Sequence, residues 1–329
     1  MTASLLSVDK LDVRFALRAR RGLLPTWIDL RAVDSVSFTL GAGETLGIVG
    51  ESGCGKSTLA RAILRLVPAA GGRVLWLGED LTKLDDDAFR RQRREFQIVF
   101  QDPLAALDPR MTAGAIIAEP LRTFHPELSR AATEAKVAAT MRDVGLAPEH
   151  INRYPHEFSG GQCQRIGIAR AIVLEPKLLV CDEPVSALDV SIQAQIINLL
   201  KRLQRDRGMA MIFISHNLAV VQHLCHRVLV LYLGKAVELA PTERLFARPL
   251  HPYTQALIAA VPVPDPAVER HRTKVVLRGD LPSPLAPPSG CPFRTRCPEA
   301  DAVCAQSMPA LLPAASDHTV ACHHAGRVR

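Results

Sequence analysis

The sequence of 329 residues lacks any apolar run near the roughly 18 residues that a membrane-spanning helix needs. Asp9 and Asp12 interrupt the first residues, MTASLLSVDKLDVRF, where a signal peptide requires an unbroken apolar stretch. Internal repeats and low-complexity tracts are also missing. We therefore expect a chain that neither spans a membrane nor is secreted, and the collagen, coiled-coil and disordered classes are excluded.

Aromatic residues are scarce, at 5% of the chain, and they are not interleaved with basic residues beyond short runs. Lys and Arg number 40 against 33 Asp and Glu, and the resulting charge of +7 is too small to identify an anionic partner. The densest basic run, with Arg90, Arg91, Arg93 and Arg94, is typical of one solvated helix face. We therefore expect no nucleic-acid partner.

What is present is an alternation of apolar runs with amphipathic stretches. The runs typical of buried strands are residues 45–49, 96–100, 178–181, 209–214 and 228–232. Strands that alternate with helices predict an α/β fold with a mostly parallel core sheet.

Other segments complete the predicted architecture. Two strand-like pieces, residues 5–15 and 33–40, predict an N-terminal β subdomain, and a helical subdomain covers about residues 103–171. Fourteen of the 24 prolines lie in the last 89 residues, which places a domain boundary near Pro262. The prediction is therefore a first domain of residues 1–262 and a Pro- and Cys-rich extension of residues 263–329.

Residues 50–58 read GESGCGKST, the pattern G-x-x-x-x-G-K-[ST], between an apolar strand and a helical run. The glycines let backbone N–H groups turn toward a phosphate chain, and the following helix directs its positive end to the same place. In this P-loop, Lys56 reaches the β- and γ-phosphates and the Ser57 hydroxyl ligates Mg²⁺. The predicted nucleotide-binding residues are Gly50, Ser52, Gly53, Cys54, Gly55, Lys56, Ser57 and Thr58.

A second set of polar residues follows two predicted strands. Asp182 and Glu183 come at one strand end, where Asp182 can hold Mg²⁺ and Glu183 can polarise an attacking water. His216 follows the strand of residues 209–214 and can donate to the γ-phosphate. An acidic pair or a lone histidine is often structural, and the P-loop is what makes this set a nucleotidase prediction.

The segment HEFSGGQCQR, residues 156–165, resembles the signature of the ATP-binding subunits of ABC transporters. Its central residues are Phe158, Ser159, Gly160, Gly161 and Gln162. The sequence predicts that Ser159 opens a helix running to about Glu175, a second N-terminus suited to anions. The resemblance implies that this helix end meets the ATP held by the opposite subunit.

Further positions are implied by the resemblance alone. Gln101 matches the loop that senses Mg²⁺ and couples to membrane subunits, and Asp189 matches the loop that links two sites across a dimer. Phe15 matches the aromatic residue that stacks on adenine, with residues 16–31 as an insertion; Trp27 is the competing candidate. Phe158 replaces the commoner Leu, and Asn217 follows His216 where Asp is usual.

The C-terminal motifs HPYTQAL, LPSP and PPSGCPFRTRCP resemble the oligopeptide and dipeptide permease subfamily. The chain as a whole looks most like the F-type ATP-binding subunits of bacterial oligopeptide permeases. This resemblance implies a D-type ATPase as heterodimer partner, two transmembrane permease subunits and an extracytoplasmic peptide-binding protein. It also implies a peripheral position on the cytoplasmic face of the membrane.

Four cysteines, Cys291, Cys297, Cys304 and Cys322, lie in the Pro-rich segment. Four thiolates could hold an iron–sulfur cluster or zinc, and free buried thiols are the alternative. The subfamily resemblance implies a [4Fe–4S] cluster, which is the prediction adopted here.

The predicted function is ATP hydrolysis that powers oligopeptide import, with ATP and Mg²⁺ as cofactors. The predicted catalytic residues are Lys56, Gln101, Glu183 and His216, and the predicted Mg²⁺ ligands are Ser57, Gln101 and Asp182. The alternatives are the same mechanism with dipeptide, glutathione or nickel as cargo, and an ABC ATPase linked to nucleic acid.

Overall fold

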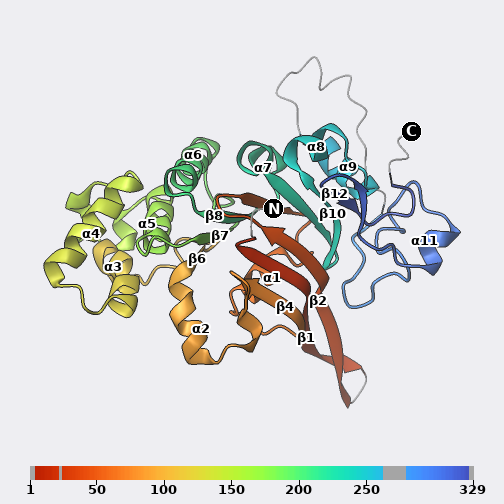
Figure 1. Ribbon diagram of the computed structural model, residues 1–329, viewed down its shortest axis with the longest axis horizontal. Coiled ribbons are helices and arrows are strands. Elements are labelled where there is room, and N and C mark those ends of the chain that lie inside the picture. The colour runs from red at the N-terminus through yellow and green to blue at the C-terminus, as the bar shows by residue number, and fades with distance from the viewer. Residues whose placement is uncertain (1–3, 22–23, 262–278, 326–329) are drawn as a thin grey trace. The chain divides into compact units, whose positions relative to one another are not determined.

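The computed structural model describes residues 4–21, 24–261 and 279–325 (Figure 1). Its contacts divide the chain into two compact units. Unit 1 comprises Met1–Leu5, Leu40–Thr45 and Lys83–Ile214, and unit 2 comprises Leu6–Thr39, Leu46–Thr82 and Ser215–Arg329. The predicted boundary at Pro262 lies outside the described residues and stays a prediction.

Unit 1 is built on three parallel strands, β6 (Phe96–Val99), β7 (Leu178–Asp182) and β8 (Ala210–Ile214). Phe96 pairs with Leu178, and Leu178 in turn pairs with Ala210. Every residue of β7 and β8 is buried, which explains their continuous apolar runs. The predicted strands in this part of the chain are therefore confirmed.

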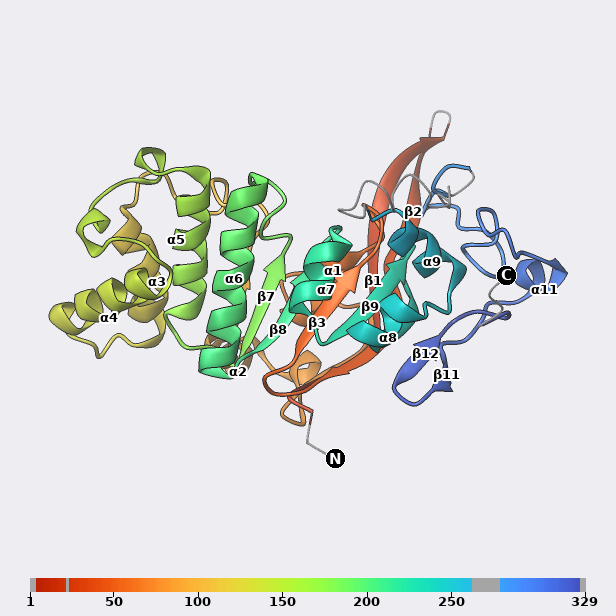
Figure 2. The same cartoon turned by 90° about the horizontal axis from the view of Figure 1, so that it is seen from above.

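Helices make up the rest of the regular structure described in unit 1, and Figure 2 shows α3, α4 and α5 grouped together with α6 beside β7. The helices are α2 (Asp86–Gln92), α3 (Ala113–Phe124), α4 (Arg130–Asp143), α5 (Gly160–Ile172) and α6 (Val190–Arg207), with short 3₁₀ turns Leu81–Lys83, Arg93–Glu95, Pro148–His150 and Pro155–Glu157. Only helices and turns are described between β6 and β7, as the helical-subdomain prediction requires.

Unit 2 holds an antiparallel sheet in the order β2-β1-β4-β5. Its strands are β1 (Leu6–Arg21), β2 (Leu24–Leu40), β4 (Gly71–Trp76) and β5 (Glu79–Asp80). The prediction that the first strand ends at Phe15 was wrong, because β1 continues to Arg21. That residues 16–31 are an insertion before the second strand stays a prediction. The two strands are neighbours in the sheet, and a ladder between them satisfies backbone polar groups in a segment that lacks an apolar pattern of its own.

A second group of strands in unit 2 carries the P-loop. The parallel pair is β3 (Thr45–Val49) with β9 (Arg227–Tyr232), and β10 (Lys235–Pro241), β12 (His318–Val320) and β11 (Leu312–Ala315) follow antiparallel. The helices are α1 (Lys56–Ile63), α7 (Leu218–Leu224), α8 (Thr242–Ala247), α9 (Pro252–Ala259) and α11 (Ala302–Gln306). The C-terminal residues thus add two strands beside β10.

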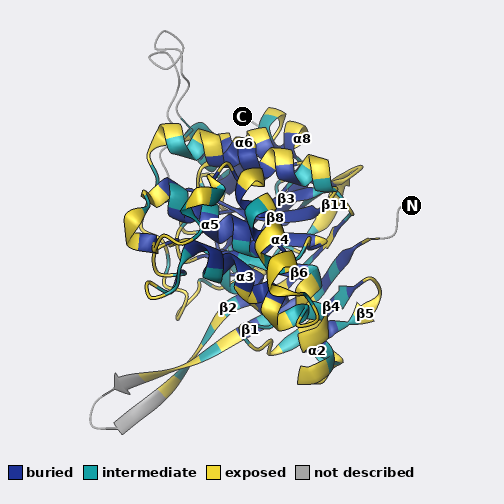
Figure 3. Ribbon diagram, turned by 90° about the vertical axis from the view of Figure 1, so that its left-hand side faces the viewer, coloured by how far each residue is buried: buried dark blue, intermediate teal, exposed yellow. Residues whose placement is uncertain are grey.

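Burial follows this plan, as the dark blue strands in Figure 3 show. The largest fully buried side chains include Trp76, Tyr232, Tyr253, Phe213 and Phe293. Among the described residues, no helix has the length and apolar character needed to cross a bilayer.

Candidate functional site

The P-loop is fixed by close backbone approaches within unit 2. Gly50 has φ +151°, and a Cβ there would lie 2.2 Å from the carbonyl oxygen of Leu231. Gly55 has φ +102°, and its Cβ would lie 2.1 Å from the carbonyl oxygen of Ala32. Both positions therefore require glycine. They hold the loop at the end of β3, where α1 begins.

Lys56 is 5% exposed, and its Nζ donates to the carbonyl oxygens of Gly50 at 2.9 Å and Glu51 at 3.0 Å. The ammonium group thus lies inside the curve of the loop. The N-cap of α1 is Gly55, which has no side chain to cap the first N–H groups. Lys56 and this helix end together suit a phosphate chain.

The other predicted P-loop residues differ in exposure. Ser52 and Gly53 are exposed, whereas Ser57 and Thr58 are half-buried in the first turn of α1. Cys54 is 1% exposed, and burial raises the pKa of its thiol. Cys54 can therefore serve a nucleotide through its backbone, while its side chain packs inward.

The acidic pair lies in unit 1, at the end of β7. Asp182 is fully buried, and Glu183 follows half-buried with φ 47°, in the left-handed region that L-residues other than Gly adopt at a cost. Gln101 Nε2 donates to Glu183 Oε2 at 3.2 Å. Two side chains separated by 82 positions in the sequence are thus brought together, and the backbone N–H of Glu183 donates to the carbonyl oxygen of Ile214 at 3.1 Å.

The signature segment opens α5 with a capping box. The Ser159 hydroxyl accepts from the Gln162 N–H at 3.4 Å, and the Gln162 side chain accepts from the Ser159 N–H at 2.9 Å. Gly160 is exposed and Gly161 is buried, where a Cβ would lie 2.6 Å from Ile192 Cγ2. The predicted helix start is therefore found, although α5 ends at Ile172 and not at Glu175.

Three further predicted residues lie at element ends. Asp189 is the exposed N-cap of α6, and Val190 beside it is 81% exposed. His216 is exposed after β8. Asn217 caps α7, because its side-chain oxygen accepts from Ala219 N at 3.1 Å, so the replacement of the usual Asp keeps a helix cap.

The two candidates for adenine stacking lie on neighbouring strands of the antiparallel sheet. Phe15 is half-buried on β1, and Trp27 is 70% exposed on β2. Exposure makes either ring available to a base, and the choice between them stays a prediction.

Magnesium is compatible with the chemistry of the predicted ligands. Ser57, Gln101 and Asp182 offer hydroxyl, amide and carboxylate oxygens, which are the donors that this hard cation prefers. The P-loop belongs to unit 2, and Gln101 and Asp182 belong to unit 1.

Two residues outside the predicted site, Arg296 and Tyr253, contact the P-loop. Arg296 forms a two-fold ion pair with Glu51, with 2.6 Å between Nη1 and Oε2 and 2.9 Å between Nη2 and Oε1. The Tyr253 hydroxyl accepts from the Glu51 N–H at 2.8 Å. The only sequence signal was their place in the C-terminal motifs.

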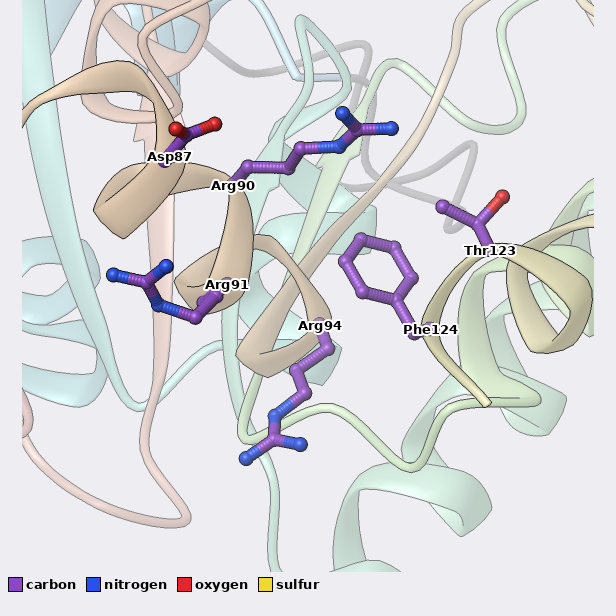
Figure 4. A pocket seen from close by; sticks show the side chains of 6 residues that line it. All are labelled: Asp87, Arg90, Arg91, Arg94, Thr123 and Phe124. Atoms are coloured by element: carbon purple, nitrogen blue, oxygen red, sulfur yellow. The ribbon is translucent and has the colours of Figure 1, made fainter. Parts of the chain in front are cut away.

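The arginine-rich helix face forms a hollow on unit 1, shown in Figure 4. It is lined by Asp87, Arg90, Arg91, Arg94, Thr123 and Phe124. All four arginines of the basic run are exposed, as predicted for a solvated helix face. None of the predicted nucleotide residues lines this hollow.

The four C-terminal cysteines do not bring their thiols together as zinc ligands would. In the described residues, the group of possible ligand atoms within 4.8 Å of one another belongs to Asp301, Cys304 and His324. Sulfur ligands of one zinc ion lie about 3.8 Å apart. Burial raises the pKa of the Cys297 thiol to about 11, so the free thiol keeps its proton at neutral pH.

Comparison with known proteins gives two family matches. Residues 33–186 match the family described as ABC transporter. Residues 237–304 match the family described as oligopeptide/dipeptide transporter, C-terminal region.

Individual relatives extend over most of the chain. The Oligopeptide transport ATP-binding protein OppF of Salmonella typhimurium is 62% identical over 89% of this chain and 87% of its own length. The protein of the same name from Haemophilus influenzae is 57% identical over 97% and 96%. A dimeric ATP-binding cassette, MJ0796, bound to ADP and Pi has a TM-score of 0.64 and 26% identity over 72% of this chain and 98% of its own.

These findings correct the prediction of a [4Fe–4S] cluster on Cys291, Cys297, Cys304 and Cys322. The relatives are named as oligopeptide transport ATP-binding proteins, names that mention no iron–sulfur cluster. Among the described residues, Cys304 is the one cysteine in the group of clustered ligand atoms. The prediction was therefore wrong. Four cysteines in a Pro-rich segment are compatible with a cluster but do not require one, because Cys291 and Cys304 are buried as small packing residues and Cys297 and Cys322 are half-buried.

The family match, the relatives and the P-loop agree on one chemistry, the binding and hydrolysis of ATP. The chain belongs to the ATP-binding subunits of ABC transporters, in the group that carries the oligopeptide/dipeptide transporter C-terminal region.

Proposed function

We propose that this chain hydrolyses ATP to power the import of oligopeptides. The observation that carries the proposal is the 62% identity to an oligopeptide transport ATP-binding protein along 89% of the chain. The C-terminal match to an oligopeptide/dipeptide transporter region supports the same cargo class.

The chemistry assigns one role to each predicted residue of the reaction. Lys56 binds the β- and γ-phosphates, and His216 donates to the γ-phosphate. Glu183 accepts a proton from a water whose oxygen bonds to the γ-phosphorus, while the bond from that phosphorus to the bridging oxygen breaks and ADP leaves. Ser57, Gln101 and Asp182 would hold Mg²⁺, which would supply positive charge that neutralises the phosphates.

The contact between Gln101 and Glu183 supports a coupling role for Gln101. A hydrogen bond of 3.2 Å joins the proposed base to a loop residue, so a change at either side chain alters the position of the other. In the proposal, Gln101 passes this change to a membrane subunit, and Asp189 passes it to a second ATPase.

The proposed assembly contains a D-type ATPase, two transmembrane permease subunits and an extracytoplasmic peptide-binding protein. The exposed helix start at Ser159 and Gly160 then faces ATP held by the partner ATPase. The chain lies at the cytoplasmic face of the membrane through its permease partners. Dipeptide, glutathione or nickel remain alternative cargoes, whereas the relatives give no support to an ATPase linked to nucleic acid.

Reconstitution tests the proposal. The chain is co-expressed with candidate D-type and permease subunits, and ATP hydrolysis in vesicles is compared with and without a peptide-loaded binding protein. We expect peptide-dependent stimulation of ATP hydrolysis. If dipeptide, glutathione or nickel stimulates ATP hydrolysis and oligopeptide does not, that compound is the cargo. Stimulation by DNA would contradict the proposal.

The adenine-stacking residue gives a separate prediction. Replacing Phe15 with Ala should weaken ATP binding roughly tenfold, because stacking of an aromatic ring on a base contributes about 1–3 kcal/mol. Trp27→Ala is the matched control and should leave ATP affinity unchanged. Equilibrium binding of ATP by calorimetry measures both, and the reverse order of effects would assign adenine stacking to Trp27.

A further inference from the structure

The C-terminal region contacts the P-loop through a part-buried ion pair. The Arg296 side chain is 8% exposed and that of Glu51 is 27% exposed, and their two short contacts have fork-to-fork geometry. The hydrogen bonds to Glu51 raise the pKa of the Arg296 guanidinium, which stays charged. The two residues are 245 positions apart in the sequence.

We propose that Arg296 is a positioning residue of the ATP site, which neutralises Glu51 and thereby sets the affinity of the P-loop for ATP. Glu51 directly follows Gly50 in the loop, and its carbonyl oxygen accepts from Lys56 Nζ at 3.0 Å. Its carboxylate is therefore a negative charge within the loop that must bind a negative phosphate chain. Arg296 removes that repulsion by pairing with it.

A packed aromatic group anchors Arg296 in place. Phe293 is 1% exposed, and its ring centroid lies 5.3 Å from that of Tyr232 and 5.4 Å from that of Tyr253. Tyr253 contacts the loop a second time, through its hydroxyl and the Glu51 N–H. One residue of the loop is thus held at its side chain by Arg296 and at its backbone by Tyr253.

The inference predicts opposite effects for the two partners of one ion pair. Arg296→Gln leaves the Glu51 carboxylate unpaired and should weaken ATP binding roughly tenfold, about 1.4 kcal/mol. Glu51→Gln removes the negative charge and should leave ATP binding as tight as in the parent or tighter. A purely structural ion pair would instead lose affinity in both variants.

The measurement is equilibrium binding of Mg²⁺ and ATP to the purified full chain, with thermal unfolding to confirm that each variant is folded. The double variant Arg296→Gln with Glu51→Gln should recover the parent affinity. Arg294→Gln is the matched control, because the Arg294 guanidinium bonds to Ser289 and not to the P-loop. Parent-like affinity in Arg296→Gln, or no recovery in the double variant, would overturn the inference.

Tyr253→Phe keeps the test open if Arg296→Gln fails to fold. It removes one hydroxyl from the contact with Glu51 and should weaken ATP binding about fivefold, the effect of one buried hydrogen bond. In the assembled transporter, Arg296→Lys should raise KM for ATP less than Arg296→Gln does and leave kcat unchanged, because it keeps the charge that neutralises Glu51 and loses the paired geometry. Weaker ATP binding in Glu51→Gln than in the parent would count against the inference, whether or not Arg296→Gln folds. ATP binding by the full chain requires no cargo, so these outcomes are independent of peptide transport.

Discussion

Replacing Glu183 with Gln should reduce ATP turnover about 10²–10⁴-fold while ATP still binds, because a general base contributes about that factor. Gln has the shape of Glu, and its side-chain oxygen can still accept from Gln101, which in the parent donates to Glu183 at 3.2 Å. The variant therefore removes a proton acceptor and keeps the contact. Steady-state phosphate release and equilibrium ATP binding measure the two effects separately.

Glu134→Gln is the control for this variant. Glu134 lies on the surface of α4, where it pairs with Arg130 at 2.8 Å, and its loss should leave turnover unchanged. Normal hydrolysis by Glu183→Gln would show that another group takes the proton. Loss of ATP binding in the same variant would show that Glu183 positions the nucleotide.

Acid should destabilise unit 2 through His251, whose pKa is lowered by burial from 6.5 to about 4. As pH falls below 6.5, the unfolded chain binds a proton at this residue and the folded chain does not, so the free energy of unfolding decreases. The decrease is about 1.4 kcal/mol per pH unit and about 3 kcal/mol by pH 4. Well below pH 4 both states are protonated and this contribution no longer changes.

The contacts of His251 explain the shift. Its Nδ1 accepts from the Tyr253 N–H at 3.0 Å, which requires an unprotonated nitrogen, and the Phe293 ring lies 5.6 Å away. The negative charge of the Glu238 carboxylate opposes this lowering of the pKa. The carboxylate accepts from the backbone N–H of His251 at 3.0 Å and contacts His318 Nε2 at 2.7 Å. Neutral His251 therefore accepts a hydrogen bond that the folded structure uses, and protonation of Nδ1 would abolish that hydrogen bond.

The variant His251→Asn distinguishes the contribution of His251 to the pH dependence of stability from those of Glu238 and His318. Asn offers an uncharged acceptor at the N-cap of α9 and should flatten the pH dependence of stability between pH 4 and 6.5. Denaturant unfolding at a series of pH values measures both proteins. An equally steep decrease in the Asn variant would assign the proton uptake to other groups.

The local sequence pattern was sufficient to predict the buried strands and the P-loop. The buried runs of β3, β7 and β8 were predicted within one or two residues, because strands buried on both faces are continuously apolar. The P-loop was predicted because its glycines, lysine and hydroxyl must stand at fixed spacing.

Features that depend on contacts between residues far apart in the sequence could not be predicted in this way. The extension of β1 past Phe15 depends on its neighbours in the sheet, and the basic segment that follows Phe15 has no strand pattern of its own. The ion pair of Arg296 with Glu51 has no local pattern. For the cysteines, spacing permitted a cluster but carried no information on where the sulfur atoms lie.

The pairing of β12 with β10 has a consequence for shortened forms of the chain. Glu238 pairs with Val320 and Leu239 with Thr319, so the C-terminal residues cover one side of β10. A chain that ends after Ala259 would expose that strand's unpaired N–H and C=O groups together with the ring of Tyr232. Such an edge is a template for strands of other copies, so the truncated protein should aggregate on expression.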